Sequence, residues 1–372
     1  MEVSRNQTPS NRTMEEGNYS SAFSHFESCQ PSSAVLFLFL IAYAAVLILG
    51  LLGNLSLIII IVKKQREAQS VTNILIANLS LSDILVCVMC IPLTVTYTLM
   101  DHWVFGELMC KLTSYVQSVS ISVSIFSLVL IAVERHQLIV KPRGWKPGVP
   151  HAYWGVTFVW FLSFLLSVPL FLAYHLTEEP FLNLSLPADL YGHRVACVET
   201  WPSRTNQLLF STSLFLLQYF VPLGFILVCY LKIVLYLRRR NRKAGRRKEK
   251  ESRFSESKRV NTTLVAIVAA FGACWLPLNV FNIIFDWHHE VLMSCHHDLV
   301  FITCHFVAMV STCINPLFYG FLNRNFQKDL MVLLHYCCCF PPQERYENIV
   351  ACSLHTDESK GSLRLAHLPT SI

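Results

Sequence analysis

Seven long apolar windows between successive charged residues constrain the fold of this chain more than any other feature of its sequence. A helix that spans a bilayer needs about 20 mostly apolar residues, and every window is long enough. A buried core helix is the alternative for any single window, but seven of this length predict an all-α membrane protein, a seven-transmembrane helix bundle. The windows are Ser28–Val62, Ala68–Met100 (interrupted only by Asp83), Leu112–Val133, Pro147–Thr177, Thr205–Leu231, Val260–Phe285 and Leu299–Asn323.

Composition agrees with a membrane protein and argues against an enzyme. A chain of 372 residues would make two or three soluble domains of about 150 residues each. However, only 15% of its residues are charged and 53% are hydrophobic, whereas soluble domains carry about 25% charged residues. The sequence has no glycine-rich phosphate loop, no His-Glu-x-x-His pair and no Gly-x-Ser-x-Gly elbow. We therefore expect neither catalysis nor a nucleic-acid partner.

The charges between the windows predict the orientation of the chain. With the N-terminus outside, the inner segments hold 25 Lys and Arg against 10 acids, and the outer segments hold 5 against 13. Such an excess of cations marks the cytoplasmic side. The C-terminus is then inside. Residues 1–27 lack the apolar core of a signal peptide, so the first span is expected to direct insertion.

Four glycosylation sequons agree with this orientation. Asn6, Asn11 and Asn18 precede the first span and Asn183 follows the fourth, which places all four outside. We expect them to carry glycans.

The cysteines divide by compartment. Of 14 cysteines, Cys29, Cys110, Cys197 and Cys295 lie outside, where oxidising conditions favour disulfides. Four cysteines allow three pairings, which the sequence leaves open. A Cys110–Cys197 bond would strap the loop before span five over the bundle, and Cys29–Cys295 would then join the N-terminal segment to the loop after span six.

The tail run Cys337, Cys338 and Cys339 follows a segment with apolar residues at helical spacing, including Phe326, Leu330 and Leu333. Three adjacent thiols suit a metal ion poorly. The pattern favours a short amphipathic helix on the inner membrane surface with palmitoylated cysteines, and unmodified thiols are the alternative. The chain thus divides into an outer glycosylated segment (1–35), the seven-helix domain (36–323), the surface helix with its cysteines (324–339) and a cytoplasmic tail (340–372).

Three polar side chains lie deep inside apolar windows. An ionised group at mid-membrane costs about 2.5–3.5 kcal/mol, so Asp83 is expected to face the interior. Asn54 and Asn315 each lie nine residues before a basic residue at the inner end of their spans, which is about 13 Å along a helix. A polar cluster of helices one, two and seven is therefore possible. It would be either a static hydrogen-bonded clamp or a small-cation site that tunes a conformational switch.

Span three carries polar residues on one face. Gln117 and Arg135 are 18 residues apart, which is five full turns, and Ser124 lies within about 20° of the same face. Gln117 is near the outer end, whereas Glu134 and Arg135 end the span inside. An interfacial anchor is the simplest role for Arg135.

Span six carries a stripe that steps by 4, 4, 3 and 4 residues and becomes polar towards the outside. The stripe ends in the carboxylate of Asp286, which favours a position at the mouth of a pocket. An ordinary solvated helix end is the alternative. Pro277 should kink this helix because it removes a backbone donor. The stripe consists of Phe271, Trp275, Asn279, Asn282 and Asp286.

Taken together, these residues resemble the rhodopsin-like G-protein-coupled receptors over about residues 36–339. The motifs that carry the resemblance are Gly53-Asn54, Asn78-Leu-Ser-Leu-Ser-Asp83, Glu134-Arg135-His136, Trp160, Pro222, Cys274-Trp-Leu-Pro277 and Asn315-Pro-Leu-Phe-Tyr319. Each motif is weak alone, but seven in order on seven spans are close to decisive.

Within that family the chain is similar to the neuropeptide Y and pancreatic polypeptide receptors. The similar stretches are Met100-Asp-His-Trp-Val-Phe-Gly106, Glu134-Arg-His-Gln-Leu-Ile139, Gly144-Trp-Lys-Pro147 and Phe285-Asp-Trp-His-His-Glu290. His136 replaces the tyrosine of the broader family but suits this branch. Ser257 stands where many relatives carry an acid that pairs with the arginine of helix three, which puts that inner latch in doubt.

The resemblance implies a multi-pass protein of the plasma membrane that binds amidated peptides of the neuropeptide Y, peptide YY and pancreatic polypeptide family. Such peptides end in Arg-Xaa-Arg-Tyr-amide or Arg-Xaa-Arg-Phe-amide. The implied inner partner is a heterotrimeric inhibitory G protein that lowers cyclic AMP, with arrestin and membrane lipids as further partners. No enzymatic cofactor is implied, only a sodium ion as a modulator.

The resemblance also implies roles for individual residues. Asp83, Ser124 and Asn315 would form the sodium site. Arg135, beside Glu134, would engage the G protein once helix six swings out, supported by Tyr230 and Tyr319. The residues that would relay ligand contact into that swing are Ile125, Pro222, Phe271, Trp275 and Pro277.

Simple electrostatics makes a cationic peptide a plausible ligand. The outer segments carry a net charge of −8, which would steer a cation inward. Asp286 can hold a guanidinium as a bidentate pair, and the amides of Gln117 and Gln218 suit a C-terminal amide. The mouth would also be lined by Tyr97, Asp101, Asn282, Phe285 and His305. On the inner side, residues 238–259 carry 12 Lys and Arg against 3 acids and suit anionic lipid or the G protein, or are simply a solvated linker.

Rival functions fit less well. An amine receptor needs an acid where Gln117 stands, and an opsin needs a lysine in span seven, which has none. A secondary transporter tends to show repeated halves and more charge inside the membrane. A receptor for another ligand class, or one that binds peptide but signals weakly, remains an alternative.

Overall fold

The computed structural model describes residues 32–67, 70–100, 102–178, 195–243, 249–288, 297–322 and 324–337. The chain forms two compact units, residues 1–323 and residues 324–372, and each is described by itself. Among the described residues of the first unit, seven helices are long and apolar enough to cross a membrane. The seven-helix fold expected from the apolar windows is thereby confirmed.

Four of the spanning helices are unbroken and three contain an irregular turn. The unbroken ones are α2 (Ser33–Glu67), α5 (Gly106–Val140), α6 (Val149–Ala173) and α11 (Glu249–Trp287). Helix two is α3 (Val71–Leu85), a π-helical turn (Val86–Cys90) and α4 (Ile91–Met100); helix five is α9 (Arg204–Phe215), a π-helical turn (Leu216–Phe220) and α10 (Val221–Lys243). Helix seven is α13 (His297–Val310), a 3-10 turn (Ser311–Cys313) and α14 (Ile314–Leu322).

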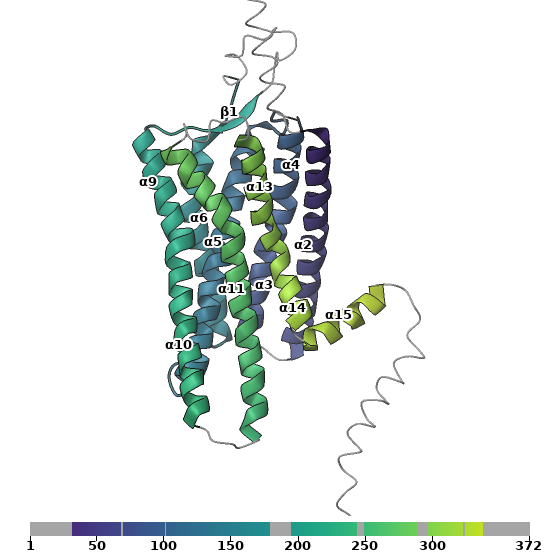
Figure 1. Cartoon of the computed structure of the whole chain (residues 1–372), viewed down its shortest axis with the longest axis vertical. Helices are drawn as coiled ribbons and strands as arrows, with labels where there is room; N and C mark the ends of the chain where they lie inside the picture. The colour runs from purple at the N-terminus through teal and green to yellow at the C-terminus, as the bar shows by residue number, and fades with distance from the viewer. Residues whose placement is uncertain are drawn as a thin grey trace, which may run out of the picture. The chain divides into compact units, whose positions relative to one another are not determined.

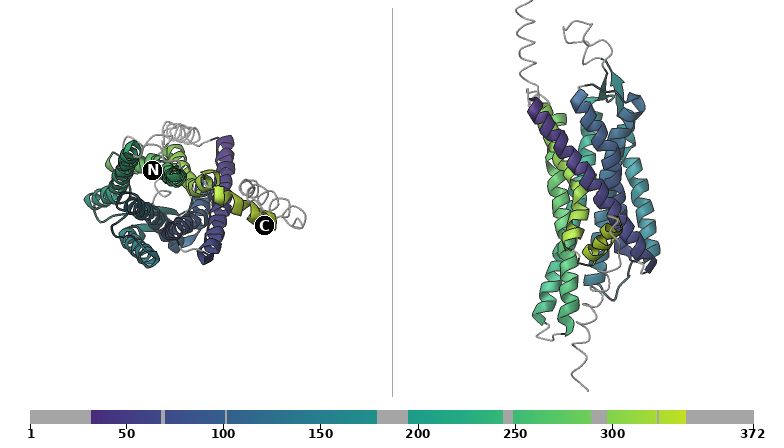
Figure 2. Two further views of the ribbon diagram at one scale, coloured as in Figure 1. Left: turned by 90° about the horizontal axis from the view of Figure 1, so that it is seen from below. Right: turned by 90° about the vertical axis from the view of Figure 1, so that its right-hand side faces the viewer.

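The helices form a closed ring, as the view along the bundle in Figure 2 shows. α5 packs against α3, α6 and α10, while α2 packs against α3 and α14, and α11 packs against α13. Large apolar side chains point away from the bundle; Trp154 and Leu172 are 75% and 74% exposed. An apolar surface of this extent is expected only where the surroundings are apolar too.

Buried polar contacts fasten helices two, three and four. Asn78 donates from Nδ2 to Oγ of Ser127 at 2.8 Å, and Trp160 donates from Nε1 to Oδ1 of Asn78 at 2.8 Å. One asparagine thus satisfies partners on two neighbouring helices. In an apolar medium such bonds fix the rotation of the helices about their axes.

Helix one is fastened to helix seven at a proline. Pro316 has no N–H, so the carbonyl of Thr312, four residues earlier, lacks its usual helical donor. Asn54 supplies one, because its Nδ2 lies 2.8 Å from that carbonyl oxygen and 2.8 Å from the carbonyl of Gly50. Helix one approaches closely here, since a Cβ built on Gly53 would lie 2.7 Å from the ring of Pro316.

This close approach predicts that Gly53→Ala destabilises the bundle. Overpacking costs about 1–3 kcal/mol, which outweighs the gain of up to about 1 kcal/mol from the higher helix propensity of alanine. Gly224 is the matched control, because it also lies within a helix but a Cβ there would meet nothing within 4 Å. Thermal unfolding of the purified full-length protein should show a lower melting temperature for Gly53→Ala and an equal or higher one for Gly224→Ala. Equal melting temperatures for the two variants would contradict the close approach.

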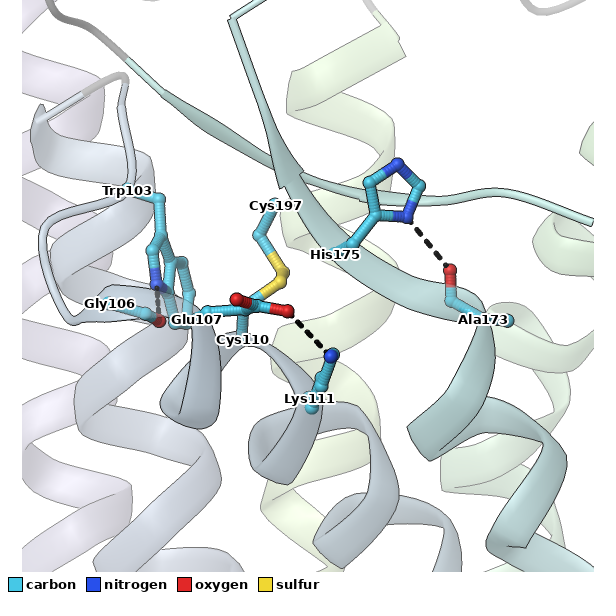
Figure 3. Close-up of polar contacts among 8 residues, drawn as sticks. All are labelled: Trp103, Gly106, Glu107, Cys110, Lys111, Ala173, His175 and Cys197. Atoms are coloured by element: carbon cyan, nitrogen blue, oxygen red, sulfur yellow. Dashed lines mark hydrogen bonds and ion pairs between the residues drawn. A yellow bond between two sulfur atoms is a disulfide. The ribbon is translucent and has the colours of Figure 1, made fainter.

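A two-stranded antiparallel sheet lies at one end of the bundle (Figure 1), which we call the hairpin end. β1 (Tyr174–Thr177) pairs with β2 (Ala196–Glu199), so that Tyr174 faces Glu199 across the strands. A disulfide joins Cys197 of β2 to Cys110 in the second turn of α5 (Figure 3), which is the pairing that would strap this loop over the bundle. Cys29 and Cys295 lie outside the described residues, as do Asn6, Asn11, Asn18 and Asn183.

A tryptophan holds the segment between helix two and α5. Trp103 is buried and donates from Nε1 to the carbonyl of Gly106 at 2.8 Å, and its backbone N–H donates to the carbonyl of Val195 at 2.7 Å. Gly106 has φ of 75°, a conformation that favours glycine, and begins α5. Figure 3 shows this contact beside the disulfide and the ion pair of Glu107 with Lys111, at 2.6 Å.

The second unit contains α15 (Arg324–Cys337), the short helix expected after the seventh span. Within it Phe326 is buried, whereas Lys328 and Met331 are exposed. Cys337 is its last residue, and Cys338 and Cys339 lie outside the described part of the chain.

Candidate functional site

Two carboxylates lie at the hairpin end. Glu199, in β2, accepts hydrogen bonds from the indole of Trp201 and from the hydroxyl of Tyr174. Burial raises the pKa of Glu199, and the negative charge of Asp286 raises it further, while the two hydrogen bonds oppose the shift. Burial also raises the pKa of Tyr174, which keeps its hydroxyl protonated as a donor. The sequence interpretation did not include Glu199, although its place two residues after Cys197 ties it to the disulfide.

Asp286 lies near the end of α11 and is partly buried. Its Oδ1 accepts a hydrogen bond from Nε2 of Gln207 at 3.1 Å, and its carboxylate also accepts one from the hydroxyl of Ser211. Arg204 donates from Nη2 to the backbone carbonyl of Asp286 at 2.8 Å. The acid expected at a pocket mouth is therefore at the hairpin end, but helix five already contacts it.

The stripe expected on span six changes from buried to exposed along α11. Phe271 and Trp275 are 8% and 3% exposed, Asn279 is half-buried, and Asn282 is exposed. This gradient agrees with a pocket that opens towards the hairpin end. Phe285, 38% exposed, stacks on buried Phe281 with ring centres 6.2 Å apart.

Deeper in the bundle, His305 of α13 is 2% exposed. The hydroxyl of Tyr43 donates to the carbonyl of Ile302 at 3.1 Å and lies 2.9 Å from Nδ1 of His305. Since one hydroxyl hydrogen cannot serve both, Nδ1–H donates to the hydroxyl oxygen and Nε2 becomes a bare acceptor. Within the described structure Nε2 is buried and has no hydrogen-bond partner.

The two glutamines assigned to the ligand amide have different surroundings. Gln117 is half-buried, and its side chain makes no hydrogen bond to another described residue. Gln218 is 8% exposed and donates from Nε2 to the hydroxyls of Ser118 at 3.0 Å and Ser122 at 2.7 Å, both on α5. Ser167 of α6 donates to Ser118 at 2.9 Å. Through Ser118, the side chains of Gln218 and Ser167 thus join helices three, four and five. The amide of Gln117 has fewer partners than that of Gln218.

Tyr97, at the end of helix two, packs edge-to-face on Trp103 with ring centres 5.6 Å apart. Asp101, the next expected lining residue, lies outside the described residues.

Near the middle of the bundle, Asp83 is 7% exposed and accepts a hydrogen bond on Oδ2 from Nδ2 of Asn315 at 2.8 Å. Ser124 is 2.8 Å from the hydroxyl of Ser82. Asp83 and Asn315, which the spacing predicted to lie at compatible heights, are thus hydrogen-bonded, and Asn54 contacts the backbone of helix seven. A small cavity here is lined by Leu79, Asp83, Ser124, Leu128, Ile267, Phe271, Ser311, Ile314 and Asn315.

The relay residues are buried or partly buried within the bundle. Ile125 is fully buried, and Phe271, which lines the cavity, contacts Trp275 with ring centres 6.1 Å apart. Pro277 lies within α11, five residues after Gly272, whose carbonyl accepts a hydrogen bond from Tyr219 at 2.8 Å. Tyr219 belongs to the π-helical turn that immediately precedes Val221 and buried Pro222.

At the opposite end of α5, Arg135 is held by helix two. Its Nη2 donates to the hydroxyl of Thr72 at 2.5 Å, and its Nε lies 3.8 Å from Oε2 of Glu134. Thr72 lies 2.8 Å from both carboxylate oxygens of Glu134. The sequence interpretation missed Thr72, because a single hydroxyl at a helix start carries no distinctive signal.

Buried polar atoms near Arg135 are left without partners. Nε of Arg135 and the hydroxyl of Tyr230 have no hydrogen-bond partner in the part of the chain that the structure describes. Orphaned buried groups cost about 1–3 kcal/mol each and point to a second arrangement in which they are paired. Tyr319 lies in α14, but its side chain is outside the description.

Comparison with known proteins gives one family and a consistent set of relatives. The model of the "7 transmembrane receptor (rhodopsin family)" matches residues 53–319. The chain is 73% identical to the neuropeptide Y receptor type 6 of Mus musculus over the full length of both chains. It is 52% identical to the neuropeptide Y receptor type 1 of Xenopus laevis and 47% to the neuropeptide Y receptor type 4 of Rattus norvegicus, covering 91% of this chain and 92% and 90% of those relatives.

Proposed function

Since the chain belongs to the rhodopsin family of seven-transmembrane receptors and to its neuropeptide Y receptor branch, we propose that it binds amidated peptides that end in Arg-Xaa-Arg-Tyr-amide or Arg-Xaa-Arg-Phe-amide. The observation that carries this proposal is the pair of carboxylates, Asp286 and Glu199, at the hairpin end of the bundle. Two acids at one mouth match two arginines in one peptide tail.

The ligand's guanidinium groups would bind these carboxylates as charge-assisted, bidentate pairs. Its last aromatic ring would lie among the rings between Phe285 and His305, which include Phe281 and Phe301. The terminal amide can donate to the bare Nε2 of His305 and both donate to and accept from Gln117. Gln218 would contribute indirectly, because its amide already binds the serines of α5.

We further propose that the hairpin end faces the extracellular space and that the receptor resides in the plasma membrane. The disulfide at this end requires an oxidising compartment. The excess of Lys and Arg in the segments at the other end agrees with a cytoplasmic location. α15 would then lie on the inner membrane surface with acylated cysteines.

The cavity beside Asp83 suits a sodium ion. Its polar lining is all oxygen or amide, from Asp83, Ser124, Ser311 and Asn315, and hard cations prefer oxygen ligands. One donated hydrogen bond leaves the buried carboxylate charge largely uncompensated. A bound ion would supply that compensation and would join helices two, three and seven.

On the cytoplasmic side we propose coupling to inhibitory G proteins through Arg135, with arrestin as a competing partner. Arg135 is restrained by Thr72 and Glu134, and its Nε and the hydroxyl of Tyr230 have no hydrogen-bond partner among the described residues. An outward movement of α11 would open a site in which these groups find new partners.

A peptide panel tests the proposal directly. Cells that express the epitope-tagged full chain would be assayed for binding of radiolabelled neuropeptide Y, peptide YY and pancreatic polypeptide, together with cyclic AMP. Saturable binding with a fall in cyclic AMP supports the whole proposal. Binding without a cyclic AMP response rejects the coupling only. A receptor at the surface that ignores all three peptides rejects the ligand class.

The raised pKa of Glu199 predicts how peptide binding depends on pH. Because its pKa is raised, Glu199 takes up a proton, and loses its charge, at a higher pH than an ordinary glutamate. As pH is lowered from neutral, affinity for an arginine peptide should therefore begin to fall at a higher pH than pairing with an ordinary glutamate would give. Glu199→Gln should bind more weakly at neutral pH and depend less on pH, as measured by saturation binding.

Glu178 serves as the control for this experiment, because it is an exposed acid just after β1. Glu178→Gln should keep the pH dependence of the parent receptor. The parent and Glu199→Gln differ only at this residue, so the difference between their pH curves reports Glu199. Parallel pH curves for Glu199→Gln and the parent would refute the role of Glu199.

A further inference from the structure

Four side chains of α9 close over the end of α11. Gln207 and Ser211 donate to the carboxylate of Asp286, and Arg204 donates to its backbone carbonyl at 2.8 Å. One residue further on, Trp287 donates from Nε1 to the hydroxyl of Thr212 at 3.3 Å. We call this set of contacts the α9–α11 clasp.

The clasp is built where helix five begins. Ser203 caps α9 by accepting a hydrogen bond from the N–H of Asn206 at 3.2 Å. This cap starts the helix at Arg204, so that positions 204, 207 and 211 follow at intervals of three and four residues and share one face. That face meets Asp286.

The clasp places a cation of the protein itself beside the acid proposed to hold a ligand arginine. Arg204 is exposed, and its positive charge acts on the Asp286 carboxylate. A ligand guanidinium that binds Asp286 must therefore approach a like charge and replace the neutral donors Gln207 and Ser211. Like charges at close range oppose binding unless they are screened or displaced.

We propose that Arg204 is a specificity-determining residue that competes with the ligand's arginine for Asp286, so that the clasp must open when the peptide binds. This inference rests on the proposed function, in particular on the role of Asp286. The clasp lowers affinity for arginine-bearing peptides and leaves contacts elsewhere in the ligand unaffected. It also joins helix five to α11 at the outer end, so its release frees the helix that carries Trp275.

The test uses the full-length receptor in membranes and a radiolabelled peptide ending in Arg-Xaa-Arg-Tyr-amide. Arg204→Gln should bind this peptide about 2- to 5-fold more tightly, the range expected for an exposed charge pair, and the gain should shrink at high salt. Arg204→Lys, which keeps the charge, should bind like the parent. With citrulline in place of the ligand arginines, the gain from Arg204→Gln should vanish.

A matched control and a double-mutant cycle separate the clasp from general electrostatics. Lys111→Gln removes one cation at the same end, but Lys111 is already paired with Glu107 at 2.6 Å, so its effect should be smaller than that of Arg204→Gln. In an Asp286→Asn background, Arg204→Gln should no longer change affinity. Surface expression of every variant is measured with an epitope tag.

The outcomes distinguish this inference from the proposed function. If Asp286→Asn weakens peptide binding but Arg204→Gln leaves it unchanged or weaker, the competition is refuted and the peptide receptor stands. If no peptide of this class binds to a receptor that reaches the surface, the proposed function fails and the inference fails with it. Tighter binding by Arg204→Gln that persists with the citrulline peptide also refutes competition for Asp286.

Discussion

Asp286→Ala is expected to weaken binding of an Arg-Xaa-Arg-Tyr-amide peptide by about 1.5–3 kcal/mol, which is about 10- to 160-fold in Kd. A charge-assisted pair with a guanidinium is stronger than a neutral hydrogen bond, and here the carboxylate is partly buried between α9 and α11. The substitution leaves the donors Gln207 and Ser211 without their acceptor, but both side chains are neutral and lie at the end of the bundle. Saturation binding on membranes from cells expressing the full chain measures the loss.

Two further variants make this result specific. Asp286→Asn keeps the size and the hydrogen-bonding capacity of the side chain but removes its charge, and should lose most of the same affinity. Glu178→Ala removes an exposed acid at the same end and should have little effect, since exposed charges in water contribute at most about 1 kcal/mol. An unchanged Kd for Asp286→Ala at normal surface expression would exclude this carboxylate from the ligand site.

The number and order of the spans followed from the sequence, but their ends did not. The third window was taken to begin at Leu112, after the charged Glu107 and Lys111, whereas α5 begins at Gly106. These two side chains are four residues apart and form an ion pair on the helix surface. A helix can extend beyond the hydrocarbon core of the membrane where its charged side chains reach water. Charged residues therefore mark the end of the apolar window but not the end of the helix.

The height of a residue along its helix was easier to predict than the direction in which its side chain points. The heights of Asp83 and Asn315 within their spans predicted their proximity, and they are hydrogen-bonded. Gln218, which stays a predicted pocket residue, lies in the π-helical turn at 216–220, and such a turn changes the directions of side chains in a way that periodicity does not predict. Its amide donates to two serines of α5.

Residues of the hairpin end were missed for a different reason. Glu199 ends the short strand β2 and Arg204 begins α9, where periodicity carries no information, and their proximity to Asp286 depends on the Cys110–Cys197 disulfide and on the cap at Ser203. The sequence offered three possible disulfide pairings. Only the folded chain identifies which acids and cations that loop brings to the mouth.

Arg135→Ala is expected to leave peptide binding measurable and to reduce agonist-stimulated nucleotide exchange on the G protein to the basal level. In the structure this guanidinium is bound to Thr72 and lies near Glu134, while its Nε and the hydroxyl of Tyr230 lack partners among the described residues. The group is therefore held in a poorly satisfied arrangement that an open bundle can exchange for contacts with a partner protein. Exchange of a labelled nucleotide on purified inhibitory G protein, with membranes containing each variant, measures the loss.

Thr72→Val decides whether stimulated nucleotide exchange depends on the guanidinium of Arg135 itself or on its contact with helix two. Valine keeps the shape of threonine but removes the hydroxyl that accepts from Arg135 and donates to Glu134. If Arg135 acts by engaging the G protein after release, Thr72→Val retains stimulated exchange, because release becomes easier while the guanidinium remains. If Thr72→Val and Arg135→Ala lose exchange equally, the contact is a structural requirement and Arg135 is not the coupling group. Retained exchange in Arg135→Ala would exclude that role outright.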